Sequence, residues 1–212
     1  ELMKEEKFDG MIITGAPVEH LDYEEVNYWD EIKEIFDWAR THVTSTLYIC
    51  WAAQAGLYHY YGVPKYKLDR KMFGVFKQYP LAPMLPIRGF DDEFYMPHSR
   101  HTEIRREDVL RVPGLEVIAE SPQSGVCMVM ARGGREIYVT GHAEYSPYTL
   151  DTEYRRDLEK GLPIDMPVNY YCHNVPEEGP LVTWRAHGNL LFSNWLNYYV
   201  YQETPYDINS IR

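Results

Sequence analysis

The chain has 212 residues, of which 45% are hydrophobic and 15% aromatic, a composition that excludes disorder and allows one domain with a sizeable core. The net charge of -11 argues against nonspecific binding of nucleic acid, which depends on a basic surface, and no apolar run approaches the length of a membrane span. Three widely spaced cysteines form neither a disulfide framework nor a zinc motif, so we expect a protein of the reducing cytoplasm.

The first part of the chain alternates between strand and helix patterns. Residues 10–14 (GMIIT) predict a short buried strand. Apolar residues then recur at helical spacing, and Asp22 with Glu25 resembles a capping box, which predicts a helix that begins at Asp22. Residues 43–49 predict a second strand, and residues 51–61 predict a second helix. This order of strand, helix, strand and helix favours a parallel α/β sheet.

The later elements are less regular. Residues 65–106 contain several prolines and little periodicity, so we expect short strands and long loops there. Residues 126–132 and 135–140 flank two glycines and predict a β-hairpin. A charged helix is expected over residues 151–160, and a C-terminal helix with a wide apolar face over residues 189–202.

Cys50 stands between the second predicted strand and the helix that follows it. A sharp strand-to-helix turn presents its apex side chain outward, and it needs small residues where helix and strand approach; Ala52, Ala53 and Gly56 meet that need. The helix N-terminus favours a thiolate and offers backbone N–H groups to an oxyanion. The pattern predicts a nucleophile at an elbow, although a buried core thiol explains Cys50 equally well when it is taken alone.

His142 and Glu144 directly follow the strand predicted over residues 135–140. A histidine base needs an acceptor on its far nitrogen to fix its tautomer and orientation, and Glu144 is near enough to supply one. Taken alone, the pair is more simply a loop histidine beside a solvated glutamate. Together with Cys50 it supplies a base and an orienting acid, so we predict a Cys50, His142 and Glu144 triad.

Two further patterns carry little weight by themselves. The turn after the first strand can supply a second oxyanion donor from the backbone N–H of Gly15 or Ala16, but such turns are common. His98 and His101 with Glu103 suggest a metal site. Their spacing is loose and a neighbouring proline favours a loop, so we expect no metal here.

Six segments together resemble one known family, the homoserine O-acyltransferases of methionine biosynthesis. They are ITGAPVE (13–19), YICWAAQAGLYH (48–59), MFGVF (72–76), PHSRHTE (97–103), VTGHAEY (139–145) and RRDLEKG (155–161). The resemblance covers essentially the whole chain. It implies an α/β, parallel-sheet, three-layer sandwich of the class I glutamine-amidotransferase-like (flavodoxin-like) type. We expect a single acyltransferase domain over residues 1–212 that lacks an N-terminal segment of the full-length protein.

The resemblance also implies a reaction. Cys50 would take an acyl group from acyl-CoA as a thioester, and His142, oriented by Glu144, would activate the hydroxyl of L-homoserine to accept it. The oxyanion would be held by the backbone amides of Gly15, Ala16 and Trp51. No bound cofactor is expected beyond acetyl-CoA as co-substrate, and the family suggests a homodimer.

Substrate-binding roles follow from the same resemblance for Lys71, Ser99 and Arg156. Lys71 and Arg156 lie in charged runs, where a solvated surface is the simpler explanation without the family. Glu19 occupies the position linked to acyl choice, with Glu in acetyl-transferring members and Gly in succinyl-transferring ones. A carboxylate there would repel the distal carboxylate of a succinyl group, which favours acetyl-CoA unless Glu19 points to solvent.

Three other functions stay open from the sequence. Succinyl-CoA is the alternative acyl donor. A glutaminase or cysteine hydrolase would use the same fold, but glutaminases carry G-x-C-x-G around the nucleophile, where this chain has Tyr48 and Ala52. A noncatalytic binding module would retain the fold without needing the thiol of Cys50.

Overall fold

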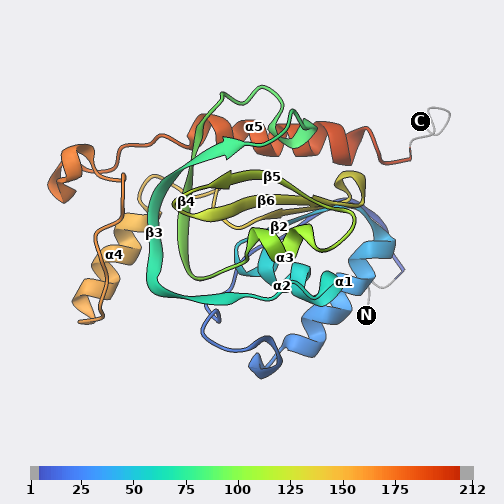
Figure 1. The fold of residues 1–212 in the computed structure, drawn as a ribbon, viewed down its shortest axis with the longest axis horizontal. Coiled ribbons are helices and arrows are strands. Elements are labelled where there is room, and N and C mark those ends of the chain that lie inside the picture. Colours follow the sequence, from blue (N-terminus) through green and yellow to red (C-terminus); the bar gives the residue numbers. More distant parts are fainter. Residues whose placement is uncertain (1–4, 206–212) are drawn as a thin grey trace.

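The computed structural model describes residues 5–205. Its strands are β1 (Phe8–Ile13), β2 (Val43–Ile49), β3 (Tyr66–Pro80), β4 (Phe94–Glu103), β5 (Leu115–Ser121), β6 (Gly125–Ala131) and β7 (Glu136–Val139). Its helices are α1 (Trp29–His42), α2 (Trp51–Tyr61), α3 (Arg106–Leu110), α4 (Thr149–Glu159) and α5 (Arg185–Trp195). A π-helical turn, Leu196–Tyr201, continues α5. These elements surround one central sheet (Figure 1).

The sheet contains seven strands in the order β1-β2-β7-β6-β5-β3-β4. Pairing is parallel between β1 and β2 and between β2 and β7, and it is antiparallel for the other neighbours. The sheet is therefore mixed, whereas the sequence pattern favoured parallel strands. The difference arises because tight connections such as the predicted hairpin, confirmed as β6 and β7, reverse the chain without a crossover helix.

Two apolar cores lie on opposite faces of the sheet, which gives the expected three layers. Side chains alternate along β2, so Leu47 and Tyr48 point to different faces. Tyr48 packs in the cluster that contains Phe36 of α1 and Leu57 of α2. Leu47 packs in the cluster that contains Trp195 of α5. Figure 1 shows α5 on one side of the sheet and α1 and α2 on the other.

The first helix begins later than the sequence predicted. Asp22 and Glu25 do form a capping box, in which the Asp22 N–H donates to Glu25 Oε2 at 3.2 Å, but this box closes only a 3-10 turn, Tyr23–Glu25. The chain is extended again at Val26, and α1 starts at Trp29. The turn is stabilised by packing, since the Tyr23 ring stacks on Trp29 at a centroid distance of 5.1 Å.

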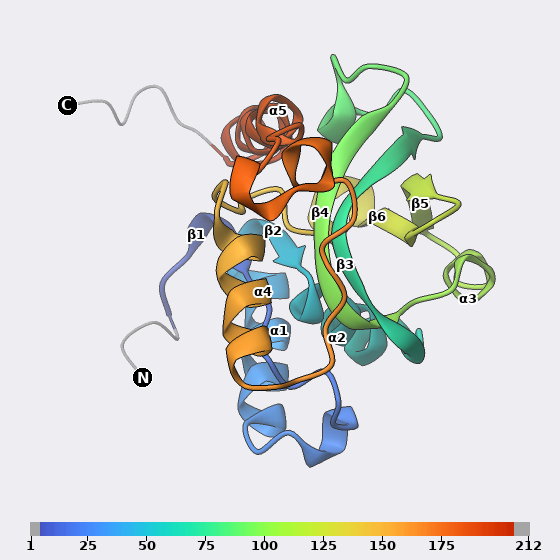
Figure 2. The same cartoon turned by 90° about the vertical axis from the view of Figure 1, so that its left-hand side faces the viewer.

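The expectation of short strands and long loops over residues 65–106 is wrong. This segment contains β3 and β4, of 15 and 10 residues, paired antiparallel over most of their length. Pro80 ends β3, and Pro97 lies in β4, an edge strand that tolerates a missing N–H donor. The chain after α4 runs along β3 (Figure 2), where Val168 bridges to Gly74. A Cβ on Gly74 would lie 2.3 Å from the Val168 nitrogen, so this crossing requires glycine.

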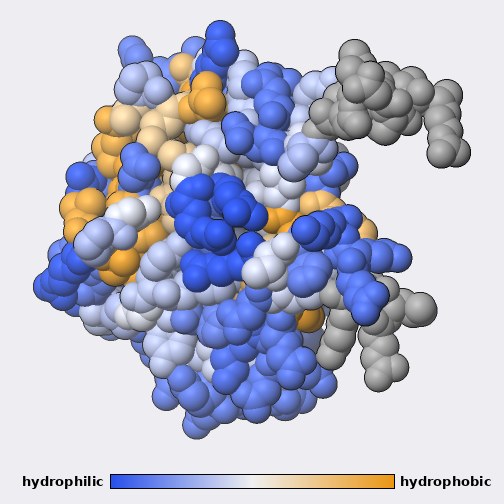
Figure 3. Space-filling model, turned by 90° about the vertical axis from the view of Figure 1, so that its right-hand side faces the viewer, coloured by the Kyte–Doolittle hydropathy of each residue, from blue (hydrophilic) through white to orange (hydrophobic). Residues whose placement is uncertain are grey.

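α2, α4 and α5 agree with the expected helices to within a few residues at each end, apart from the π-helical end of the last one, whereas α3 was not predicted. Within the described part of the chain, no helix has the length and apolar character needed to cross a membrane. The face drawn in Figure 3 is mainly hydrophilic, with apolar residues gathered toward one side.

Candidate active site

Cys50 sits at a strained turn between β2 and α2. Its φ of 55° and ψ of -117° are unusual for a residue with a side chain, and such strain is typical of a nucleophile elbow. The Cys50 N–H donates to the Val139 carbonyl at 2.7 Å, which fixes the turn to the end of β7. The small residues of α2 are needed as expected, because a Cβ on Gly56 would meet the Tyr138 ring at 3.0 Å. The thiol is buried, and it also lines a cavity.

The loop after β1 approaches this turn closely. A Cβ placed on Gly15 would lie 3.2 Å from Cys50 Cβ and 3.4 Å from the backbone nitrogen of Trp51. It would also lie 3.6 Å from Cys50 Sγ. Gly15 and the start of α2 therefore flank the sulfur, and a side chain at Gly15 would crowd the space beside it.

His142 and Glu144 form the second part of the site. His142 Nδ1 and Glu144 Oε1 are 2.6 Å apart, and the His142 N–H donates to the Pro97 carbonyl of β4 at 2.8 Å. The Tyr145 ring stacks on the imidazole with a centroid distance of 4.1 Å and an interplanar angle of 14°. Contacts at the backbone, the ring face and one ring nitrogen thus hold the imidazole in one orientation.

The thiol of Cys50 hydrogen-bonds to the same imidazole. Burial by itself would lower the pKa of His142, but the charge and hydrogen bond of Cys50, followed by those of Glu144, raise it to about 10. His142 is then an imidazolium at neutral pH. The imidazole can therefore exchange a proton with a group that reacts at the Cys50 sulfur. The three predicted side chains are therefore joined in sequence: sulfur, imidazole, carboxylate.

One cavity of about 540 Å³ gathers most of the other predicted residues. The predicted site residues that line this cavity are Gly15, Ala16, Glu19, Cys50, Lys71, Ser99, His142 and Arg156. It also contains Pro17, His20, His101, Tyr145, Glu153, Asp157, Lys160 and Leu162. Glu144 and Trp51 do not line this space, since Glu144 lies behind the imidazole and Trp51 packs in the core below α1.

Lys71, Ser99 and Arg156 are held by two acids that the sequence reasoning did not single out. Lys71 Nζ lies 2.7 Å from Glu153 Oε1, and Ser99 Oγ donates to both oxygens of Glu153 at 2.8 and 2.9 Å. Arg156 binds Asp157 Oδ1 at 2.7 Å. These acids had a usable signal, because positions 153, 156, 157 and 160 share one face of a helix.

Glu19 points into the cavity rather than to solvent. Its Oε2 accepts the backbone N–H of His101 at 2.5 Å. Burial raises the pKa of the Glu19 carboxyl, while the His101 N–H and the positive charge of Arg100 act in the opposite direction. The position is thus able to influence what occupies the cavity.

The two histidines of the considered metal motif are separated. His98 is fully buried and accepts from Arg100 Nε at 3.3 Å, whereas His101 lines the cavity and contacts the His20 ring at 4.4 Å. Burial lowers the pKa of His98 well below its usual value. Among residues 5–205, no group of three or more acidic, histidine or cysteine side chains is arranged to hold a metal.

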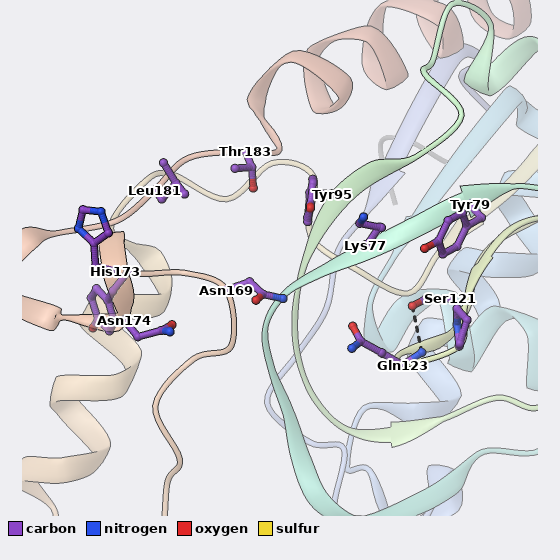
Figure 4. A pocket seen from close by; sticks show the side chains of 12 residues that line it. Lys77, Tyr79, Tyr95, Ser121, Gln123, Asn169, His173, Asn174, Leu181 and Thr183 are labelled. Atoms are coloured by element: carbon purple, nitrogen blue, oxygen red, sulfur yellow. Dashed lines mark hydrogen bonds between the residues drawn. The ribbon is translucent and has the colours of Figure 1, made fainter.

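A second cavity of about 670 Å³ lies farther along β3 and β4 (Figure 4). Its lining includes Lys77, Tyr79, Tyr95, His173 and Asn174. None of the triad residues reaches it. The larger cavity therefore does not carry the cysteine chemistry.

Solved structures of low sequence identity share the fold of this chain. A glutamine amidotransferase from Thermotoga maritima has a TM-score of 0.66 at 14% identity, covering 90% of this chain and 78% of that chain. A glutamine amido transferase from Methylobacillus flagellatus has a TM-score of 0.65 at 13% identity, covering 89% of this chain and 76% of that chain. At these identities the likeness shows the fold alone. The chain has the class I glutamine amidotransferase-like fold, as expected, with its cysteine at the strand-to-helix turn.

The sequence comparisons identify the family. The family described as homoserine O-succinyltransferase matches residues 1–206. A homoserine O-acetyltransferase of Bacteroides fragilis (strain YCH46) is 74% identical over 211 residues, 99% of this chain and 69% of the relative. The homoserine O-acetyltransferase of Bacteroides thetaiotaomicron is 74% identical, over 100% of this chain and 70% of the relative. That of Desulfitobacterium hafniense (strain DCB-2) is 58% identical, over 99% of this chain and 68% of the relative. The chain belongs to this family of homoserine acyltransferases.

Proposed function

We propose that this protein transfers an acetyl group from acetyl-CoA to the hydroxyl of L-homoserine, giving O-acetyl-L-homoserine and CoA. The observation that carries the proposal is the connected triad, with the Cys50 thiol on one side of His142 and Glu144 at 2.6 Å on the other, at a cavity. Family membership and the names of the relatives support this choice of substrates.

The first half of the reaction acylates the enzyme. The Cys50 thiolate attacks the thioester carbonyl carbon of acetyl-CoA, a new C–S bond forms, and the bond to the CoA sulfur breaks. The departing CoA thiolate takes the proton of the His142 imidazolium. The products of this step are an acetyl-thioester on Cys50, neutral His142 and CoA.

The second half transfers the group to homoserine. Acylation removes the negative charge of the Cys50 sulfur, which is the largest cause that raises the pKa of His142. Neutral His142 then takes the proton of the homoserine hydroxyl as its oxygen attacks the thioester. The C–S bond breaks, and Cys50 leaves as a thiolate beside the new imidazolium. Glu144 keeps the imidazole in the orientation that both halves need.

The backbone N–H groups of Gly15, Ala16 and Trp51 stabilise the oxyanion of both tetrahedral intermediates. Support comes from the close approach of the Gly15 loop to Cys50 and to the Trp51 nitrogen. Lys71 and Arg156 bind the carboxylate of homoserine, and Ser99 contributes from the same wall of the cavity.

Glu19 selects the acetyl donor. Its partly buried carboxyl would face the distal carboxylate of a succinyl group, whereas an acetyl group presents only a methyl. The alternative is succinyl transfer, which the description of the family supports. Steady-state rates with acetyl-CoA and succinyl-CoA decide between the two. We expect Glu19→Gly to raise the relative rate with succinyl-CoA; a wild-type preference for succinyl-CoA would contradict this role of Glu19.

The proposal is tested by product formation. Purified protein with acetyl-CoA and homoserine should give O-acetylhomoserine, and Cys50→Ala should abolish it, whereas Cys172→Ala, a thiol outside the cavity, should not. A glutaminase would instead release ammonia from glutamine through Cys50, and a binding module would behave alike with and without the thiol. We also propose that residues 1–212 form a single acyltransferase domain and that two chains form a homodimer. Sedimentation of the purified chain measures the oligomeric state.

A further inference from the structure

We propose that Lys65 is a positioning residue for the choice of acyl donor, which holds the main chain at Glu19 so that the Glu19 carboxyl stays in the cavity. The inference rests on the proposed function and deepens it, because it assigns this choice to two residues rather than to Glu19 alone. Lys65 stands directly before β3 and does not line the cavity. It therefore acts through the loop that bears Glu19 and not by contact with a substrate.

The loop that bears Glu19 has little regular structure of its own. Residues 14–22 belong to neither a helix nor a strand. Two backbone hydrogen bonds shape the loop, from the Val18 N–H to the Ala16 carbonyl at 2.9 Å and from the Leu21 N–H to the Val18 carbonyl at 3.1 Å. Connecting segments of this kind are more mobile than the elements they join. The direction of the Glu19 side chain therefore depends on contacts with the rest of the fold.

The ammonium group of Lys65 supplies such contacts. Its Nζ donates to the Glu19 carbonyl at 3.1 Å and to the Leu21 carbonyl at 2.5 Å. It also lies 4.4 Å from the centre of the Tyr23 ring, a cation–π contact. That ring is buried and stacks on Trp29. The ammonium group thus joins the loop both to the start of β3 and to the aromatic core.

The surroundings of Lys65 differ from those of a solvated surface lysine, which keeps its charged head in water. Lys65 is partly buried, and burial lowers the pKa of its ammonium group. The charges of three nearby acids act in the opposite direction, those of Asp22, Glu19 and Glu24. A cation held by carbonyls, a ring and acidic neighbours fixes the chain path around it.

Glu19 is consequently held at two points. Lys65 holds its carbonyl, and the backbone N–H of His101 in β4 donates to its Oε2 at 2.5 Å. The largest charge acting on this carboxyl is that of Arg100, so Lys65 contributes chiefly to its position. Without Lys65 the loop is free to shift, and the carboxyl then loses the orientation in which it repels the distal carboxylate of a succinyl group.

The test separates the choice of acyl donor from the use of the acceptor. Acylation of Cys50 is measured without homoserine, by mass spectrometry after rapid mixing with acetyl-CoA or succinyl-CoA, and the two rate constants give an acetyl-to-succinyl ratio. The variants are Lys65→Met, which keeps the side-chain length without the donors, Lys65→Arg, Glu19→Gly and the control Lys67→Met. Lys67 is an exposed lysine of β3 outside the cavity.

Wild type and Lys67→Met should share the same preference for acetyl-CoA. Lys65→Met should lower the ratio by about fivefold or more, a factor in the range for loss of a hydrogen bond to a charged group. Lys65→Arg keeps a cationic donor and should retain most of the preference. In the Glu19→Gly background, Lys65→Met should change the ratio no further, because Lys65 acts through that carboxyl. The KM for homoserine in the complete reaction should not change.

A role of Lys65 limited to stability would slow acylation by both donors by the same factor, and an unchanged ratio in Lys65→Met would overturn the inference. A further shift of the ratio in the double variant would also overturn it, since Lys65 would then act by another route. If Lys65→Met does not fold, Lys65→Gln, whose shorter neutral side chain cannot replace the ammonium group, is judged by the same criteria. Absence of a Cys50 adduct in wild type with both acyl-CoAs refutes the proposed function, whereas normal acylation with an unchanged ratio refutes only the role of Lys65.

Discussion

The pKa of His142 should depend on the sulfur of Cys50. In the folded protein this pKa lies at about 10 against an ordinary value of 6.5, although burial acts to lower it. The difference corresponds to about 5 kcal/mol in favour of the imidazolium. Because the charge of Cys50 is the largest cause that raises this pKa, Cys50→Ala should bring it down to about 8 or lower, with burial and Glu144 unchanged.

Nuclear magnetic resonance of histidine-labelled protein measures this pKa directly. His142→Gln identifies the resonance by its disappearance, and Cys172→Ala is the matched control because Cys172 is a thiol outside the cavity. The acetylated enzyme should resemble Cys50→Ala, since the thioester carries no charge. A pKa near 10 that persists in Cys50→Ala, or one already near 6.5 in wild type, would refute the thiolate–imidazolium pair.

Stability and turnover should respond to the same contacts around the imidazole. Because the folded pKa of His142 is raised, its contribution to stability is complete below the unfolded value of about 6.5 and is lost as pH rises toward about 10. Glu144→Gln removes one cause of the raised pKa of His142 and leaves Cys50 in place, so the free energy of unfolding of wild type should exceed that of Glu144→Gln by more at pH 6 than at pH 10; an equal difference at both pH values in denaturant titrations would contradict the assignment. Glu144→Gln keeps the shape but removes the charge that orients His142, so kcat should fall by about 100-fold or more in steady-state assays; an unchanged kcat would show that Glu144 is dispensable. Tyr145→Phe preserves the stacking on His142 and should retain kcat within a few-fold, whereas Tyr145→Ala should lower it about tenfold or more; equal losses in both variants would assign the effect to the hydroxyl instead.

The prediction of the triad residues came from local sequence patterns. Cys50 follows a β-branched strand and precedes small helical residues, and His142 and Glu144 are two positions apart, so the chemistry is readable within short segments. The meeting of the two segments followed from both lying at strand ends, which the parallel pairing of β2 and β7 brings together.

Long-range pairing explains the features that the sequence did not reveal. β3 and β4 were missed because their stability comes from each other and because prolines obscured the strand pattern. Glu153 was missed because its partner Lys71 is 82 residues away, so both looked like members of solvated charged runs. The capping box predicted for Asp22 and Glu25 is present, but the helix does not begin there. The packing of Tyr23 decides the path of the chain after the turn.

The central claim is that Cys50 carries the acetyl group between two substrates. Mass spectrometry after rapid mixing with acetyl-CoA alone should show one acetyl group per chain, located on Cys50 and absent in Cys50→Ala. Addition of homoserine should then remove the group at a rate no slower than kcat and yield an equal amount of O-acetylhomoserine. Product formation without a Cys50 adduct, or an adduct that homoserine removes more slowly than turnover, would contradict the account.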